Sequence, residues 1–138
     1  MINQGQTTSF KQELYEGIHD FLTDSIYIAL YDGNATLTAA TTVYSTSNEV
    51  VGTGYTAGGE ELQNATVNAA DDTAYISFDN IDWTNASFTA RCALIYNATK
   101  GNKSIAVLDF GSDKTVVNQT LTITFPANLP DSAIIRSS

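Results

Sequence analysis

Residues 88–96 read Phe-Thr-Ala-Arg-Cys-Ala-Leu-Ile-Tyr, and strand character is clearer here than anywhere else in the chain. Side chains alternate between the two faces of a strand, so this segment predicts two sets of side chains on opposite faces. The first set is Phe88, Ala90, Cys92, Leu94 and Tyr96, and the second is Thr89, Arg91, Ala93 and Ile95. A mostly apolar strand of this kind indicates a β-domain.

Further strand candidates lie on both sides of this segment. They cover residues 26–31, 41–44, 62–68, 73–78, 105–108, 116–125 and 133–136. Turn residues separate them, notably Asp32-Gly33-Asn34, the pair Asp71-Asp72 and the polar stretch 97–103. Seven or eight short strands favour a mainly β fold, a single antiparallel β-sandwich of immunoglobulin-like or jelly-roll-like type, over a barrel or a βαβ fold.

The N-terminal segment has a different pattern. Residues 1–8 are polar, and we expect a flexible arm that becomes ordered only on a partner. Ser9 and Gln12 fit a capping box, and apolar residues then recur at helical spacing, which predicts one helix over residues 9–23. Gly17 weakens this helix by about 1 kcal/mol relative to alanine. The helix and the strands form one expected domain, residues 9–138.

Charge and length exclude several classes of function. The 138 residues suit one domain, and their 15 acidic and 6 basic side chains give a net charge of −9. Such a surface repels duplex nucleic acid and anionic membranes. The chain has no apolar run of about 18 residues and its start does not resemble a secretory signal, so we expect neither a membrane span nor export.

Possible catalytic or metal-binding residues are few. His19 is the only histidine and has no neighbouring ligand, and Cys92 is the only cysteine, which predicts a buried small side chain. The glycine-rich loop 52–59 lacks the lysine and the following helix of a phosphate-binding loop. Asp109-Phe110-Gly111 matches a kinase triplet without the rest of the kinase signature, so we interpret it as a strand end and turn.

Three further sequence patterns are weaker candidates for a binding site. Segments 79–82 and 109–113 carry carboxylates that could bind Ca²⁺, although solvated turns are the favoured interpretation. Asn-x-Ser/Thr sequons begin at Asn34, Asn64, Asn85, Asn97, Asn102 and Asn118. A carbohydrate-binding face could use Trp83, Tyr27, Tyr31, Tyr44, Tyr55, Tyr75 and Tyr96, but core or interface positions are the favoured interpretation. We therefore expect no catalytic residue, no cofactor and no metal.

Several segments, in order, resemble a family of small virion proteins of tailed bacteriophages. They are SFKQELYEGIHDF, YIALYDGNATLTAATTVY, NEVVGTGYTAGG, FTARCALIYN, AVLDFGSDK and FPAN, and the resemblance runs from Ser9 to Arg136. It implies a non-enzymatic capsid decoration (cement) protein, often trimeric, that binds the major capsid protein on the virion surface. The alternative expectation is a tail, adaptor or fibre-associated virion protein that binds the host surface or a carbohydrate.

Overall fold

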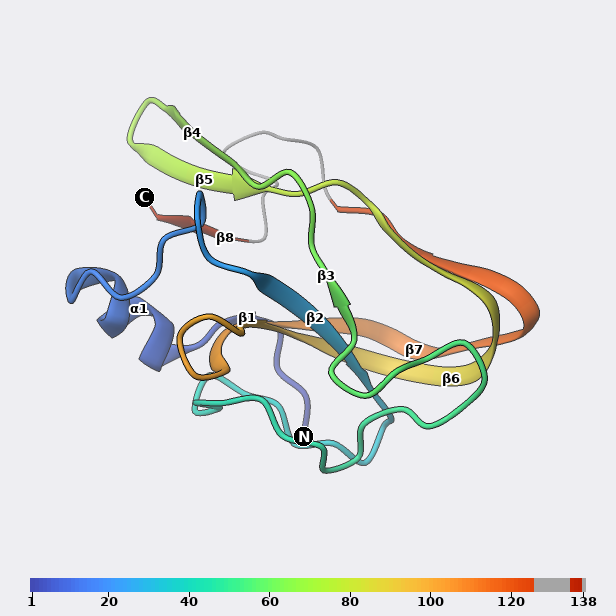
Figure 1. The fold of residues 1–138 in the computed structure, drawn as a ribbon. Coiled ribbons are helices and arrows are strands. Elements are labelled where there is room, and N and C mark those ends of the chain that lie inside the picture. Colours follow the sequence, from blue (N-terminus) through green and yellow to red (C-terminus); the bar gives the residue numbers. More distant parts are fainter. Residues whose placement is uncertain (126–134, 138) are drawn as a thin grey trace.

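In its described residues the protein is mainly β, with two antiparallel sheets and one short helix. The computed structural model describes residues 1–125 and 135–137. The main sheet has the order β1-β7-β6-β2-β3 and the small sheet the order β4-β5-β8 (Figure 1). The elements are β1 (Gly5–Gln6), α1 (Thr8–Tyr15), β2 (Ile26–Tyr31), β3 (Glu60–Glu61), β4 (Thr66–Ala70), β5 (Thr73–Ser77), β6 (Ile81–Asn97), β7 (Lys103–Ile123) and β8 (Ile135–Ser137). The predicted sandwich-like architecture is confirmed at this level.

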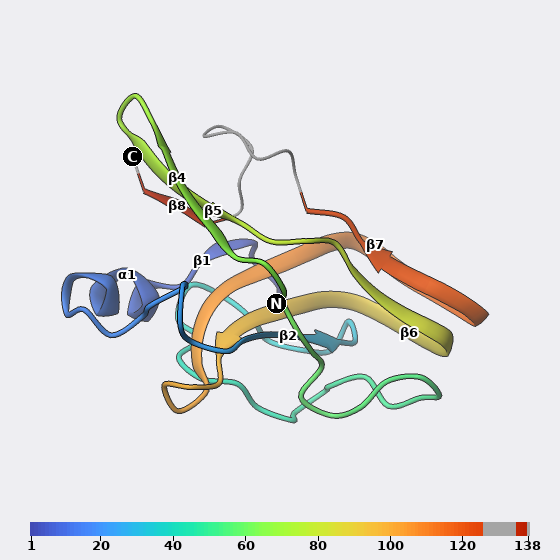
Figure 2. The ribbon, with the colours of Figure 1, turned by 45° about the horizontal axis from the view of Figure 1, so that its top comes forward.

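Strands β6 and β7 form one long curved ribbon that reaches from the main sheet towards the small sheet (Figure 2). The expected loop at 97–103 is their hairpin turn. The segments 105–108 and 116–125 were expected as separate strands, but both belong to β7 up to Ile123. The predicted turn at 109–111 is therefore wrong. Gly111, at φ +82°, instead lies in an irregularity within β7, where residues 110–113 stand opposite Arg91.

This irregularity also corrects the predicted faces of residues 88–96. Ala90 pairs with Lys114 and Cys92 with Asp109, so the alternation of side chains shifts between Ala90 and Cys92. Phe88, Ala90, Ala93 and Ile95 join one hydrophobic cluster, whereas Cys92, Leu94 and Tyr96 join the other. A bulge inserts residues without a partner, and it therefore reverses which side chains share a face.

The arm predicted at residues 1–8 is paired with the rest of the molecule. Gly5 and Gln6 form β1 against Val107 and Ala106 of β7, and the Asn3 N–H donates to the Leu37 carbonyl at 2.9 Å. The expectation of a free arm is wrong because its backbone extends an open sheet edge. Polar side chains do not prevent such pairing, since main-chain groups make it.

Helix α1 is shorter than predicted and begins earlier. Its N-cap is Thr7, whose hydroxyl accepts from the Phe10 N–H at 3.3 Å, so the expected Ser9 cap is wrong. It ends at Tyr15 because Gly17 adopts φ +72° and Ile18 N–H donates to the Glu13 carbonyl, a pattern that closes helices. The rest of the expected helix, up to residue 23, is a turn that returns to the sheet.

Two hydrophobic clusters lie on opposite sides of the main sheet. The larger fills the space between this sheet, α1 and the small sheet, and includes Phe10, Phe21 and Ile95. The smaller lies under residues 32–48 and includes Leu37 and Leu94. Figure 2 shows the loop segments and the small sheet on opposite sides of the main sheet.

The expected hairpin at Asp71-Asp72 is confirmed, since it joins β4 to β5 and Asp71 adopts φ +52°. The segment 41–44 contributes only a bridge from Val43 to Lys103. The expected closing strand at 133–136 lies partly outside the described residues, and its described part belongs to β8.

Candidate functional site

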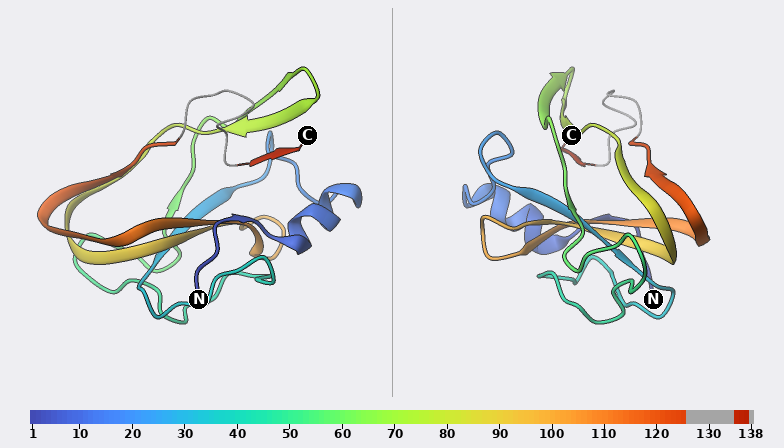
Figure 3. Two further views of the ribbon diagram at one scale, coloured as in Figure 1. Left: turned by 180° about the vertical axis from the view of Figure 1, so that it is seen from behind. Right: turned by 45° about the vertical axis from the view of Figure 1, so that its right-hand side comes forward.

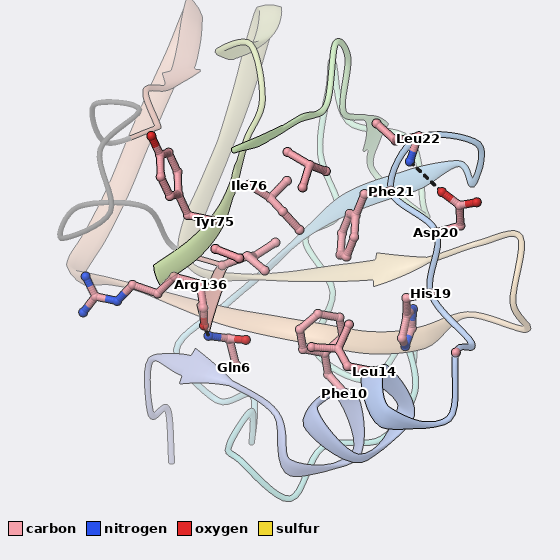
Figure 4. Close-up of a pocket in the computed structure, with 14 residues that line it drawn as sticks. Gln6, Phe10, Leu14, His19, Asp20, Phe21, Leu22, Tyr75, Ile76 and Arg136 are labelled. Atoms are coloured by element: carbon pink, nitrogen blue, oxygen red, sulfur yellow. Dashed lines mark hydrogen bonds between the residues drawn. The ribbon is translucent and has the colours of Figure 1, made fainter. Parts of the chain in front are cut away.

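A groove of about 430 Å³ opens between α1 with the turn that follows it and the small sheet. Its floor is aromatic: Phe10 is fully buried, Phe21 is 8% exposed, and their ring centroids lie 5.9 Å apart. Figure 4 shows Ile76 of β5 facing Phe21 across this space, with Leu22 and Asp20 at one end and Arg136 and Gln6 at the other. The groove therefore has an acidic residue, Asp20, at one end and a basic residue, Arg136, at the other.

The rim of the groove is apolar and exposed. Leu14 on α1 is 38% exposed, Leu22 is 73% exposed and Val67 on β4 is 50% exposed. These are three of the eight large apolar side chains that the described residues leave exposed. Concentration of such side chains around one hollow is typical of a binding surface.

A buried polar network lies beside the groove and fixes the turn after α1. The His19 side chain is fully buried, and its Nδ1 accepts from the Asn97 amide at 3.0 Å. Nε2 therefore carries the proton and donates to the Glu13 carboxylate at 2.8 Å. The Asn97 amide also donates to Asp24 at 2.8 Å, and Lys100 pairs with Asp24 at 3.0 Å. This network connects the turn to the β6–β7 hairpin.

This network favours the ionised form of the Asp24 side chain. Burial of the Asp24 carboxylate opposes its ionisation, but hydrogen bonds from the Asn97 amide, the Asp20 N–H and the Lys100 ammonium outweigh it. The pKa of Asp24 consequently lies below its ordinary value of 3.8. The carboxylate is therefore a structural anion and is poorly suited to act as a general acid.

A second polar group, the tyrosine–Glu49 cluster, comprises Tyr44, Glu49, Tyr55, Gly58 and Tyr96. Glu49 is only 8% exposed, yet its carboxylate accepts from the Tyr44 hydroxyl at 2.6 Å, the Tyr55 hydroxyl and the Gly58 N–H at 2.8 Å. The Tyr96 hydroxyl donates to the Gly58 carbonyl at 2.6 Å. A buried carboxylate with three donors is stable without a cation.

The same contacts keep the tyrosines protonated. Burial first, and then the hydrogen bond to Glu49, raises the pKa of Tyr44 and of Tyr55 above the ordinary value of 10.0. Burial, with Glu49 nearby, raises the pKa of Tyr96 to about 12. These hydroxyls are donors at neutral pH and poor nucleophiles, so the cluster acts as a structural clamp.

The glycine-rich loop 52–59 supplies part of this clamp. A Cβ on Gly59 would lie 1.8 Å from the Ile28 carbonyl oxygen, and one on Gly52 would lie 2.6 Å from that of Ser87. Only glycine allows these backbones to approach so closely. The interpretation as a structural loop, and not a phosphate-binding one, agrees with this packing.

The remaining sequence candidates have structural roles. Cys92 is fully buried as predicted, and burial, with Asp109 nearby, raises the pKa of its thiol to about 11. In the possible calcium segments, Asp79 accepts from Asn64, Asp82 from Thr122 and Asp109 from Arg91. Within residues 1–125 and 135–137, no group of three or more His, Cys, Asp or Glu is placed to hold a metal ion.

The sequons and aromatics also find local explanations. Four of the six sequon asparagines adopt positive φ, which asparagine tolerates well at turns and bulges. They are Asn64, Asn85, Asn102 and Asn118. The seven aromatics of the possible carbohydrate-binding face are buried or half-buried, led by Trp83 at 1% exposure. Sequence reasoning missed the groove because its walls come from segments about 50 residues apart.

Comparison with family models, with curated proteins and with solved structures finds no match for this chain. Among the described residues, no helix combines the length and the apolar character that a membrane crossing requires.

Proposed function

We propose that this chain is a non-enzymatic structural protein of a phage virion, and specifically a capsid decoration protein that binds the assembled major capsid protein shell. The observation that carries the proposal is the ordered series of segments, from Ser9 to Arg136, that resembles small virion proteins. The resemblance is most specific in the sequences GTGYTAGG and LDFGSDK, which lie within two of these segments.

The roles of these segments support a common framework with that family. GTGYTAGG contains Gly52, Gly59 and Tyr55, which hold the loop against the sheet and close the tyrosine–Glu49 cluster. LDFGSDK forms the irregularity in β7 that reverses the faces of β6. These segments therefore hold the architecture together, and the proposed function rests on their resemblance to the family and not on a reactive site.

The proposed mechanism is stabilisation by mass action. A protein that binds only the assembled shell lowers the free energy of that shell relative to its dissociated subunits. A homotrimer is part of the proposal, since family members are often trimeric. The helix is shorter than expected, and Tyr15 is the only exposed aromatic side chain among the described residues, so a trimer would use other surfaces.

The alternative is a tail, adaptor or fibre-associated protein of the virion. Its carbohydrate-binding form loses support because the aromatic side chains it needs are buried or half-buried. The host-surface form has no feature in its favour among the described residues. Head decoration is therefore the form that we propose.

The test is reconstitution on undecorated heads. Purified full-length protein is added to heads and to isolated tails, occupancy is measured by cryo-electron microscopy, and the temperature of genome release is recorded. We expect regular occupancy of heads and a higher release temperature. Binding to tails alone would establish the alternative, and binding to neither would refute the virion proposal.

A further inference from the structure

Charge is divided unequally along the chain, and most of the residues that line the groove belong to its acidic part. Residues 12–90 contain twelve Asp and Glu residues and no Lys or Arg. Leu14 and Leu22 on one wall, and Val67 and Ile76 on the other, all belong to this stretch. These four apolar residues thus come from a stretch that carries only negative formal charge, whereas Arg136, which also lines the groove, lies outside it.

Five of these twelve acidic residues lie at one end of the molecule, where α1 also carries Lys11. Glu13 and Glu16 lie on and just after α1, Asp20 lines the groove, and Asp71 and Asp72 form the tip of the β4–β5 hairpin. Figure 3 shows α1 and this hairpin extending towards the same end of the molecule. A cationic partner is therefore attracted to the end where the groove lies.

The two ends of the groove differ in charge. Asp20 lies beside Leu22, and its carboxylate accepts from the Leu22 N–H at 3.0 Å. Arg136 lies at the opposite end, where its carbonyl accepts from the Gln6 amide at 2.6 Å. A bound segment would consequently have a preferred direction, with its positive flank at the Asp20 end.

We propose that this groove binds a protein segment whose apolar side chains are flanked on one side by Lys or Arg. The apolar side chains would lie over Phe10 and Phe21, between Leu14, Leu22 and Val67. The identification of this segment as part of the shell protein rests on the proposed function.

The first experiment uses the full-length protein and synthetic peptides in solution. A peptide with several leucines and a flank of lysines on one side, the Leu–Lys peptide, is titrated while methyl resonances of the protein are recorded. One control peptide replaces lysine by glutamate, and another replaces leucine by serine. We expect the Leu–Lys peptide to bind at least about tenfold more tightly than either control and to shift Leu14, Leu22 and Val67 resonances. Equal binding of the three peptides, or shifts confined to other regions, would overturn the proposal.

A matched pair of variants separates the groove from general charge attraction. Val67→Lys and Val117→Lys add the same charge at exposed strand positions, 50% and 65% exposed, but only Val67 lines the groove. We expect Val67→Lys to weaken the Leu–Lys peptide about tenfold and Val117→Lys by no more than about twofold. Leu22→Ser provides a second groove variant if Val67→Lys fails to fold. Equal losses for the groove and control variants would contradict a groove-specific site.

The same variants on undecorated heads distinguish this proposal from the proposed function. If wild-type protein and Val117→Lys decorate heads and Val67→Lys does not, both proposals are supported. If all three decorate heads equally, decoration stands and the groove is not the docking surface. If the Leu–Lys peptide binds the groove but no head is decorated, the groove stands and the head assignment fails.

Discussion

The tyrosine–Glu49 cluster and the groove beside α1 differ in whether the chain itself covers their surface. In the cluster, the chain folds a glycine-rich loop directly against the sheet, and every hydrogen-bonding atom of the Glu49 carboxylate finds a donor. At the groove, α1 and the small sheet stay apart, and Leu22 and Val67 remain exposed over an aromatic floor. One region is closed by the chain itself and the other is left open.

Because of this difference, we expect the residues that stabilise the fold to be distinct from the residues that affect binding. Residues in the closed region contribute buried contacts and satisfied hydrogen bonds, so their loss should lower the free energy of unfolding. Residues at the rim of the groove contribute little to folding, so their loss should change binding alone. The first three comparisons each set a substitution of a buried residue against a matched one at an exposed position.

The largest expected effect is that of Leu94→Ala. Leu94 is fully buried in the cluster shared with Tyr31 and Tyr96, so truncation should cost about 2–5 kcal/mol. Leu22→Ala makes the same chemical change at a 73% exposed position and should stay within about 0.5 kcal/mol. Denaturant titration measures both. Similar losses would mean that the groove rim is part of the core.

Removal of the Glu49 carboxylate should have the next largest effect. Glu49→Ala leaves the Tyr44 and Tyr55 hydroxyls and the Gly58 N–H without their acceptor, at an expected cost of about 2–4 kcal/mol. Glu60→Ala, at an exposed position, is the control and should be near neutral. If the two variants unfold at the same denaturant concentration, the cluster does not stabilise the fold.

Loss of the helix cap should have a smaller effect. Thr7 is fully buried, and its hydroxyl accepts from the Phe10 N–H and from Ser104 at 3.0 Å. Thr7→Ala should therefore cost about 1–2 kcal/mol, whereas Thr8→Ala, at an exposed position, should cost less than about 0.5 kcal/mol. Thermal unfolding of both variants tests this prediction, and a neutral Thr7→Ala would contradict the observed cap.

The Asp24 network predicts a pH dependence in the acid range. Because the folded protein lowers the pKa of Asp24, its charge stabilises the fold above the ordinary value of 3.8 and this contribution disappears as the pH falls through the lower, folded-state value. The difference in unfolding free energy between wild type and Asp24→Asn should be constant near neutral pH and shrink in acid. A difference that grows in acid would reverse the predicted sign.

The strand pattern in the sequence was sufficient to predict much of the framework. Residues 26–31 and the hairpin at Asp71-Asp72 were identified because apolar alternation and turn residues are local signals. The sequence did not show which side chains of β6 share a face, because the reversal between Ala90 and Cys92 depends on extra residues in the partner strand β7. The ordered arm was missed because its pairing uses backbone groups, which leave no trace in side-chain pattern.

Less of the groove than of the framework could be predicted from the sequence. Gly17 was recognised as weakening a helix, but not as its end, so the turn that brings Phe21 back onto Phe10 could not be anticipated. The opposite wall depends on where the β4–β5 hairpin docks. The absence of Lys and Arg from residues 12–90 was visible in the sequence, and it was the one available signal of the proposed acidic binding surface.

We expect the closed region to support the fold and the open groove to bind the partner. Hydrogen–deuterium exchange of the full-length protein, free and bound to undecorated heads, tests this expectation directly. We expect binding to slow exchange in residues 8–22 and 66–77 and to leave exchange in residues 45–59 unchanged. Slower exchange in residues 45–59, with no change beside the groove, would contradict it.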